Sequence, residues 1–92
     1  MERKYSTARG VAMKLAEQIM RELERQPWPD ASAIVIVRFN RKMARVNAWR
    51  AGGSIEIEAT RGKNSIATRS QWGFAALEGA ALDVVAWLAI DA

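Results

Sequence analysis

Four short segments suited to β-strands follow one another through the middle of this chain, and turn-forming residues separate each from the next. The segments are residues 31–39, 43–50, 55–60 and 65–68, and NRK, AGGS and RGKN join them. Runs of this length that contain β-branched residues and are divided by short turns are typical of successive hairpins. The pattern therefore predicts a four-stranded antiparallel meander.

Helical sequence flanks this predicted sheet on both sides. In residues 6–26 an apolar residue recurs at every fourth position from Val11 to Leu23, which is the spacing of one helix face. Pro27 follows and ends the helix, because proline lacks the backbone donor that a helix needs. The N-terminal segment is therefore predicted to be an amphipathic helix that packs on the sheet.

A second helix is expected after the last strand. Thr68 and Gln71 stand three residues apart, as in a capping box, and Ser70 is an alternative cap. Residues 72–90 are apolar nearly all round, so this helix has to be covered on more than one side. The cover is either the N-terminal helix or a second copy of the chain, which leaves open a homodimer through residues 72–90.

The same C-terminal segment is long enough to cross a membrane. It contains Glu78 and Asp83, however, and each would cost about 2.5 kcal/mol or more at the centre of a bilayer. No basic segment followed by an apolar stretch opens the chain, so no signal peptide is visible. We expect a cytoplasmic protein without a membrane partner.

The predicted fold class is α+β, with residues 1–92 forming one small domain. Its elements are an N-terminal helix, a four-stranded antiparallel meander and an apolar C-terminal helix, with both helices on one face of the sheet. Alternation along the second strand places Ala44, Val46 and Ala48 beneath the helices. The opposite face is expected to carry Met43, Arg45, Asn47 and Trp49, with Ile34, Ile36 and Arg38 alongside. A shift of the register by one residue would reverse this assignment.

Composition removes the commonest catalytic chemistry. The chain has no histidine and no cysteine, so it lacks the usual general base, thiolate nucleophile and metal ligand. Glu56 and Glu58 share one side of their strand, but pairing with Arg45 or Arg61 is the favoured interpretation of these carboxylates. We therefore expect a protein that is not an enzyme and that uses no cofactor or metal.

Positive charge is concentrated in the middle of the chain. Residues 31–77 hold eight bases and two acids, whereas residues 78–92 hold three acids and no base. The densest stretch is VRFNRKMARVNAWR, residues 37–50, with five bases and no acid. Such a stretch can be an ordinary solvated strand pair with a basic turn, or it can attract a phosphate backbone or an acidic protein surface.

The first functional hypothesis is a non-catalytic module that binds nucleic acid or a nucleoprotein complex. Basic side chains that follow a phosphate backbone, with an aromatic ring on which bases stack, are typical of proteins that bind single-stranded DNA or RNA. The residues predicted to bind are Arg38, Arg41, Lys42, Arg45, Asn47, Trp49, Arg50, Arg61 and Lys63.

The second hypothesis is a small interaction protein that docks on an acidic patch of a larger protein machine and inhibits or adjusts it. Inhibitors from phages and mobile elements, including anti-CRISPR proteins, are similarly compact and free of cofactors. Under this hypothesis Ile34, Ile36 and Met43 would be the apolar anchors of the interface.

Residues 62–77, GKNSIATRSQWGFAAL, resemble the end of the single-strand-binding domain of transcriptional coactivators of the positive-cofactor-four type. In those domains a basic turn, a short strand, a cap and a Gln-Trp pair open the final helix. The resemblance implies a dimer joined through that helix, with strands that present basic and aromatic residues to single-stranded nucleic acid. The long N-terminal helix of this chain and its very apolar last helix depart from that family.

Overall fold

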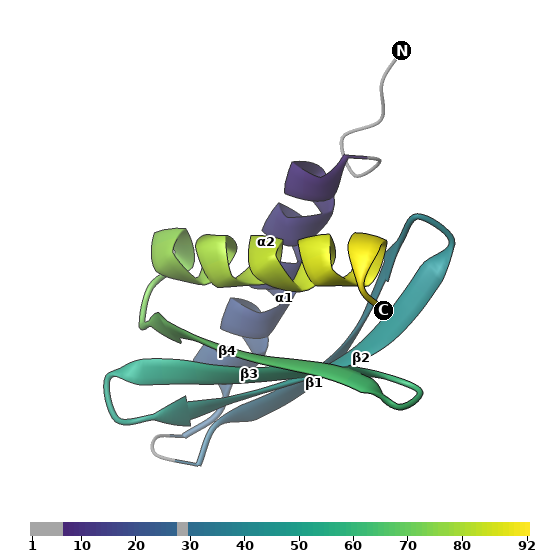
Figure 1. Cartoon of the computed structure of the whole chain (residues 1–92). Helices are drawn as coiled ribbons and strands as arrows, with labels where there is room; N and C mark the ends of the chain where they lie inside the picture. Colours follow the sequence, from purple (N-terminus) through teal and green to yellow (C-terminus); the bar gives the residue numbers. More distant parts are fainter. Residues whose placement is uncertain (1–6, 28–29) are drawn as a thin grey trace.

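The computed structural model describes residues 7–27 and 30–92, and it confirms the predicted order of helices and strands. Trp28, which its position between two prolines predicts to cover an edge of the core, lies outside the described residues. The elements are α1 (Ala8–Arg25), β1 (Ser32–Phe39), β2 (Lys42–Ala51), β3 (Ser54–Arg61), β4 (Asn64–Gln71) and α2 (Phe74–Ile90). The strands form one antiparallel sheet in the order β1-β2-β3-β4, and both helices lie on the same side of it (Figure 1).

Two-residue turns join the strands and fix their register. Asn40 and Arg41 both have positive φ angles, 55° and 65°, which is the pattern of a type I′ turn. Gly52 and Gly62 have φ angles of 64° and 62° at the first central position of their turns, as type II′ turns require. Both kinds of turn match the right-handed twist of neighbouring strands, so the geometry of all three turns suits the meander, although arginine is not a residue that the first turn prefers.

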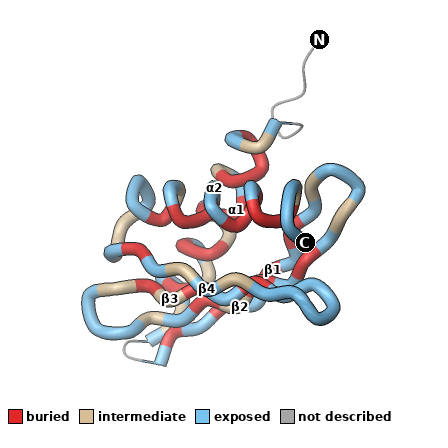
Figure 2. The backbone as a smooth tube through the Cα atoms, viewed as in Figure 1, coloured by how far each residue is buried: buried red, intermediate tan, exposed pale blue. Residues whose placement is uncertain are grey.

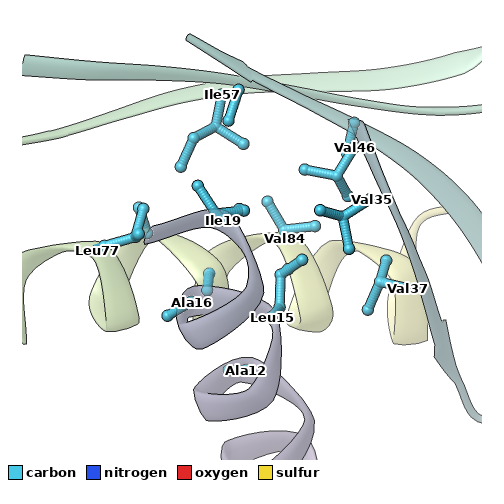
Figure 3. Close-up of a cluster of buried hydrophobic side chains, with 14 of the residues drawn as sticks. Ala12, Leu15, Ala16, Ile19, Val35, Val37, Val46, Ile57, Leu77 and Val84 are labelled. Atoms are coloured by element: carbon cyan, nitrogen blue, oxygen red, sulfur yellow. The ribbon is translucent and has the colours of Figure 1, made fainter. Parts of the chain in front are cut away.

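The core lies between the sheet and the two helices. Buried residues line the inner sides of all these layers, and exposed residues lie on the opposite side of the sheet (Figure 2). In the close-up, Ile19 of α1 lies among Ile57 of β3 and Leu77 and Val84 of α2 (Figure 3). These four side chains are at most 1% exposed, so α1 contributes to the packing of both other layers.

The beginning of α2 differs from the sequence-based prediction. Thr68 and Ser70 do not cap the helix, because they pair with β3 as part of a β4 that continues to Gln71. The N-cap is Gly73, whose φ of 142° is a conformation that glycine adopts readily and other residues rarely. The predicted capping box is therefore wrong, since strand pairing outweighed a local helix signal.

The α2 helix packs on α1 and on β4, which confirms that the N-terminal helix covers one of its sides. Phe74, Leu82 and Ile90 remain exposed on it. A homodimer through residues 72–90 stays a prediction. Within residues 7–27 and 30–92, no helix is both long and apolar enough to cross a membrane.

Gly79 offers a direct test of the packing around α2. It lies within the helix and is exposed, and a Cβ added to it would meet no atom within 4 Å. Gly79→Ala should therefore stabilise the protein by about 0.5 to 1 kcal/mol, because alanine loses less backbone entropy in a helix. Thermal unfolding measures this gain, and a lower melting temperature would show that the surface around Gly79 is occupied in solution.

Candidate binding surface

We call the side of the sheet that faces away from the helices the open face (Figure 1). Alternation and register assign its residues. They are Ser32, Ile34, Ile36 and Arg38 of β1; Met43, Arg45, Asn47, Trp49 and Ala51 of β2; Ser54, Glu56, Glu58 and Thr60 of β3; and Ser65, Ala67, Arg69 and Gln71 of β4. This assignment confirms the predicted orientation of the first two strands.

Large apolar side chains are unusually prominent on the open face. Ile34 is 62% exposed, Ile36 51%, Met43 50% and Trp49 41%. Side chains with this much exposure are not part of the core, and a contiguous group of them is typical of an interaction surface. Trp49, in particular, is available for contact with a ligand.

Charge divides the open face into two halves. The half formed by β1 and β2 carries Arg38 and Arg45 and no acidic residue. We call it the acid-free half. The half formed by β3 and β4 carries Glu56 and Glu58 beside Arg69. An anionic ligand is therefore attracted to β1 and β2 rather than to the whole sheet.

Register determines which residues of the acid-free half are neighbours. Arg38 is opposite Met43, and Arg45 is opposite Ile36. Trp49 lies four residues along β2 from Arg45, which corresponds to about 13 Å along a strand. The half is therefore a strip with its arginines toward one end and its tryptophan toward the other, and Asn47 lies between them.

The basic turns predicted to contribute lie at the arginine end of this strip. In a meander the β1–β2 and β3–β4 turns occur at the same end of the sheet, as Figure 1 shows. Arg41 is exposed in the first turn, and Arg61 and Lys63 are exposed at the second. Together with Arg38 and Arg45 they make this end of the molecule strongly positive.

Lys42 has a different role from the one predicted. Its Nζ donates to the carbonyl oxygens of Ala89 and Ala92 at 3.3 and 2.9 Å, at the C-terminal end of α2. Helix carbonyls at this end carry partial negative charge and lack partners within the helix, so a lysine there is stabilising. The structure thus ties Lys42 to α2 instead of placing it among the open-face residues.

Substitution of Lys42 tests whether its hydrogen bonds to Ala89 and Ala92 stabilise the fold. Lys42→Met keeps much of the aliphatic side chain but removes the donor, so it should destabilise the protein by about 1 kcal/mol. Urea denaturation measures the change, and Arg41→Met in the same turn is the control for loss of charge alone. Equal destabilisation by the two variants would contradict a specific role for the Lys42 ammonium.

Arg50 is also separated from the other predicted binding residues. It lies at the opposite end of β2, and its guanidinium stacks over the Trp72 ring with Cζ 4.1 Å from the centroid. Alternation places it on the same side of the strand as buried Ala48, which is the side covered by the helices. Arg50 and Trp72 therefore form a cation–π contact that joins β2 to the segment before α2.

The structure confirms only in part the pairing that the sequence predicted for the carboxylates of β3. Glu56 is opposite Arg69 and accepts a hydrogen bond from its Nε at 2.5 Å. The predicted partners of these carboxylates, Arg45 and Arg61, form no ion pair among the described residues. The prediction of cross-strand pairing is confirmed, but the predicted partner residues are wrong. The predicted fourth strand ended at residue 68, so Arg69 was not placed opposite Glu56.

Sequence reasoning missed the position of Arg69 on the open face and the commitment of Lys42 to α2. Alternation would have found Arg69 if β4 had been extended beyond residue 68. No sequence signal reveals the role of Lys42, since its two contacts join residues 47 and 50 positions apart. Of the residues predicted to bind, Arg38, Arg45, Asn47 and Trp49 lie together on the strip, with Arg41, Arg61 and Lys63 at its end.

The described residues contain no group of three or more acidic side chains arranged to hold a metal ion. A scan against models of protein families finds no family that matches the chain, and searches of curated proteins and of solved structures find no match either. The resemblance of residues 62–77 to single-strand-binding coactivators receives no support from these comparisons. Interpretation of the function therefore depends on the geometry of the open face.

Proposed function

We propose that this chain is a non-catalytic binding protein that engages nucleic acid, or a nucleoprotein complex, through the acid-free half of its open face. One observation carries the proposal: Arg38, Arg45 and exposed Trp49 share two strands that carry no carboxylate, and Glu56, opposite Trp49 on β3, is paired with Arg69. Arginines on such a strip hold phosphates, and an exposed indole ring stacks on a base, which suits single strands.

The turn at the arginine end adds a second reason. Arg41 occupies a left-handed conformation that favours glycine and costs other residues roughly 1 kcal/mol or more. A strained backbone conformation at a non-glycine residue is a reason to assign that residue a role, and for an exposed arginine the role is binding. Arg41, with Arg61 and Lys63 across the same end, extends the positive strip beyond the last ladder pair.

The test is fluorescence anisotropy with labelled single- and double-stranded DNA and RNA of equal length, at about 50 and 200 mM salt. If about four phosphates are contacted on a single strand, the fourfold increase in salt should weaken binding about 50-fold, because displaced counterions drive association. Trp49→Ala should weaken single-strand binding about 5- to 100-fold through lost stacking. Absence of binding to all four nucleic acids at low salt would contradict the proposal.

A second candidate function is docking on an acidic surface of a larger protein machine, as a phage-type inhibitor or adaptor does. The observation that favours it is the exposure of Ile34, Ile36 and Met43, since interface centres are rich in apolar side chains and methionine, with arginine also enriched. Met43→Ser distinguishes the two functions. It should change nucleic-acid affinity less than twofold, whereas it should weaken docking on a protein about tenfold or more.

A further inference from the structure

The β1 strand forms one edge of the sheet, and every second residue along it points its backbone groups away from β2. The N–H of Arg50 donates to the carbonyl of Ala31 at 3.1 Å, which fixes the alternation of hydrogen-bonded pairs along these strands. It follows that Ile34, Ile36 and Arg38 direct their N–H and C=O groups to the free edge. These are backbone groups that another strand can pair with.

The first residue of this edge, Ser32, already has its outward backbone groups paired, and their partner is a side chain. The amide of Gln26 accepts a hydrogen bond from the Ser32 N–H at 3.1 Å and donates one to the Ser32 carbonyl at 2.5 Å. The amide thus occupies the place that a peptide unit of a neighbouring strand would take. In the part of the chain that the structure describes, no hydrogen-bond partner meets the edge groups of Ile34 and Ile36 in this way.

A groove runs beside this free edge, between β1 and α1. It consists of two hollows of about 400 and 460 Å³ that share Gln18 and Ile36 in their linings. Val11 and Leu15 of α1 and Val37 of β1 form apolar walls in the first hollow. The groove therefore offers unpaired backbone on one side and apolar contacts on the other.

Charge in the groove selects the chemistry of an occupant. Arg21 lines it from α1 and Arg38 lines it from β1. The acid in its lining, Glu22, forms an ion pair with Arg25 at 2.7 Å. The excess of positive charge favours a segment with carboxylates and disfavours a basic one.

We propose that the groove binds an extended, acidic segment of a partner protein, which adds to β1 as a fifth strand of the sheet. Main-chain hydrogen bonds to Ile34 and Ile36 supply affinity, and alternate side chains fill the apolar hollows, as in other cases of strand addition. The Gln26 amide closes one end, so about five partner residues lie along the edge from Ile34 to Arg38. This site goes beyond the proposed nucleic-acid function, because it uses the backbone edge of β1 and side chains of α1, and it shares only Arg38 with the strip that carries Arg45 and Trp49.

The probe is a fluorescein-labelled seven-residue peptide of alternating glutamate and valine, EVEVEVE, titrated into the full chain. It should bind at least tenfold more tightly than the basic peptide KVKVKVK. It should also bind at least tenfold more tightly than EEEEVVV, which has the same composition but no alternation. Methylation of its central backbone nitrogens should weaken binding at least tenfold, because those nitrogens donate to the edge carbonyls of β1. Equal binding of the three peptides, or no loss on methylation, would overturn the proposal.

A protein variant tests the position of the site. Ile36→Pro removes an edge N–H that no strand of the sheet uses, so the fold should survive while peptide binding falls at least tenfold. Ala67→Pro is the matched control, since it removes the equivalent free N–H on the opposite edge strand, β4, and should change affinity less than twofold. Circular dichroism verifies that both variants fold, and the methylated peptide provides a test that leaves the protein unaltered.

Two further measurements separate this proposal from its competitors. Trp49→Ala should weaken nucleic-acid binding but change peptide affinity less than twofold, so either function can fail while the other stands. Sedimentation velocity should give the same oligomeric state for the chain alone and for Ile36→Pro at the concentrations of the peptide titration. A dimer that Ile36→Pro abolishes would overturn the proposal, because the occupant of the edge would then be a second copy of the chain.

Discussion

Replacement of Ile19 with alanine should lower the free energy of unfolding by about 3 to 4 kcal/mol. Ile19 has no exposed surface and lies among Ile57, Leu77 and Val84, where α1, α2 and the sheet meet (Figure 3). Loss of the buried methyl and methylene groups leaves a cavity, because α1, α2 and the sheet can move only partly into the space. Because domains of this size are stable by only about 5 to 15 kcal/mol, the effect is large.

Urea denaturation measures this change, with Ile19→Val as the matched control. The valine variant retains the branched shape and should lose only about 0.5 to 1.5 kcal/mol. The m value, which is the slope of the unfolding free energy against urea concentration, should be the same in both variants as in the unaltered chain if unfolding exposes the same surface. A loss below 1 kcal/mol for the alanine variant would mean that Ile19 is not enclosed by both helices and the sheet.

The double variant Arg38→Ala and Arg45→Ala should weaken binding of single-stranded nucleic acid about 10- to 100-fold at low salt. These arginines are opposite Met43 and Ile36 in the acid-free half, so neither is neutralised by a carboxylate across the ladder. Removal of two phosphate contacts should reduce the slope of log affinity against log salt by about 1.4 for a single strand. Anisotropy titrations at several salt concentrations give both quantities.

The control has to remove the same charge from another surface. Arg9→Ala combined with Arg25→Ala does so on exposed positions of α1, on the other side of the sheet. We expect this variant to keep the salt slope and to lose less than threefold in affinity. If the two double variants lose affinity equally, binding depends on net charge and not on the open face.

Alternation made the open face predictable from the sequence. Met43, Arg45, Asn47 and Trp49 occur at every second position of β2, so one assignment of register places all four on the same side. The buried Ala44, Val46 and Ala48 between them settle which side faces the helices. Turn residues supported the order of the strands, and the helical period supported α1.

Features that depend on distant parts of the chain were not predictable in this way. The start of α2 was misplaced because Thr68 and Ser70 carry a local capping signal, whereas their pairing with β3 is visible only in the sheet. Lys42 resembles any basic turn residue until α2 brings its last carbonyls close to it. The groove beside β1 likewise exists only because α1 lies along a strand edge, which no local pattern encodes.

The most direct test of the central claim is an NMR titration of ¹⁵N-labelled protein with a short single-stranded oligonucleotide at low salt. We expect the largest shifts in the backbone amides of Arg38, Arg45 and Asn47 and in the indole N–H of Trp49, with smaller shifts at Arg41. Signals of α1 and α2 should stay nearly unchanged. Shifts confined to the helices, or shifts spread evenly over the surface, would contradict the assignment of the acid-free half as the binding site.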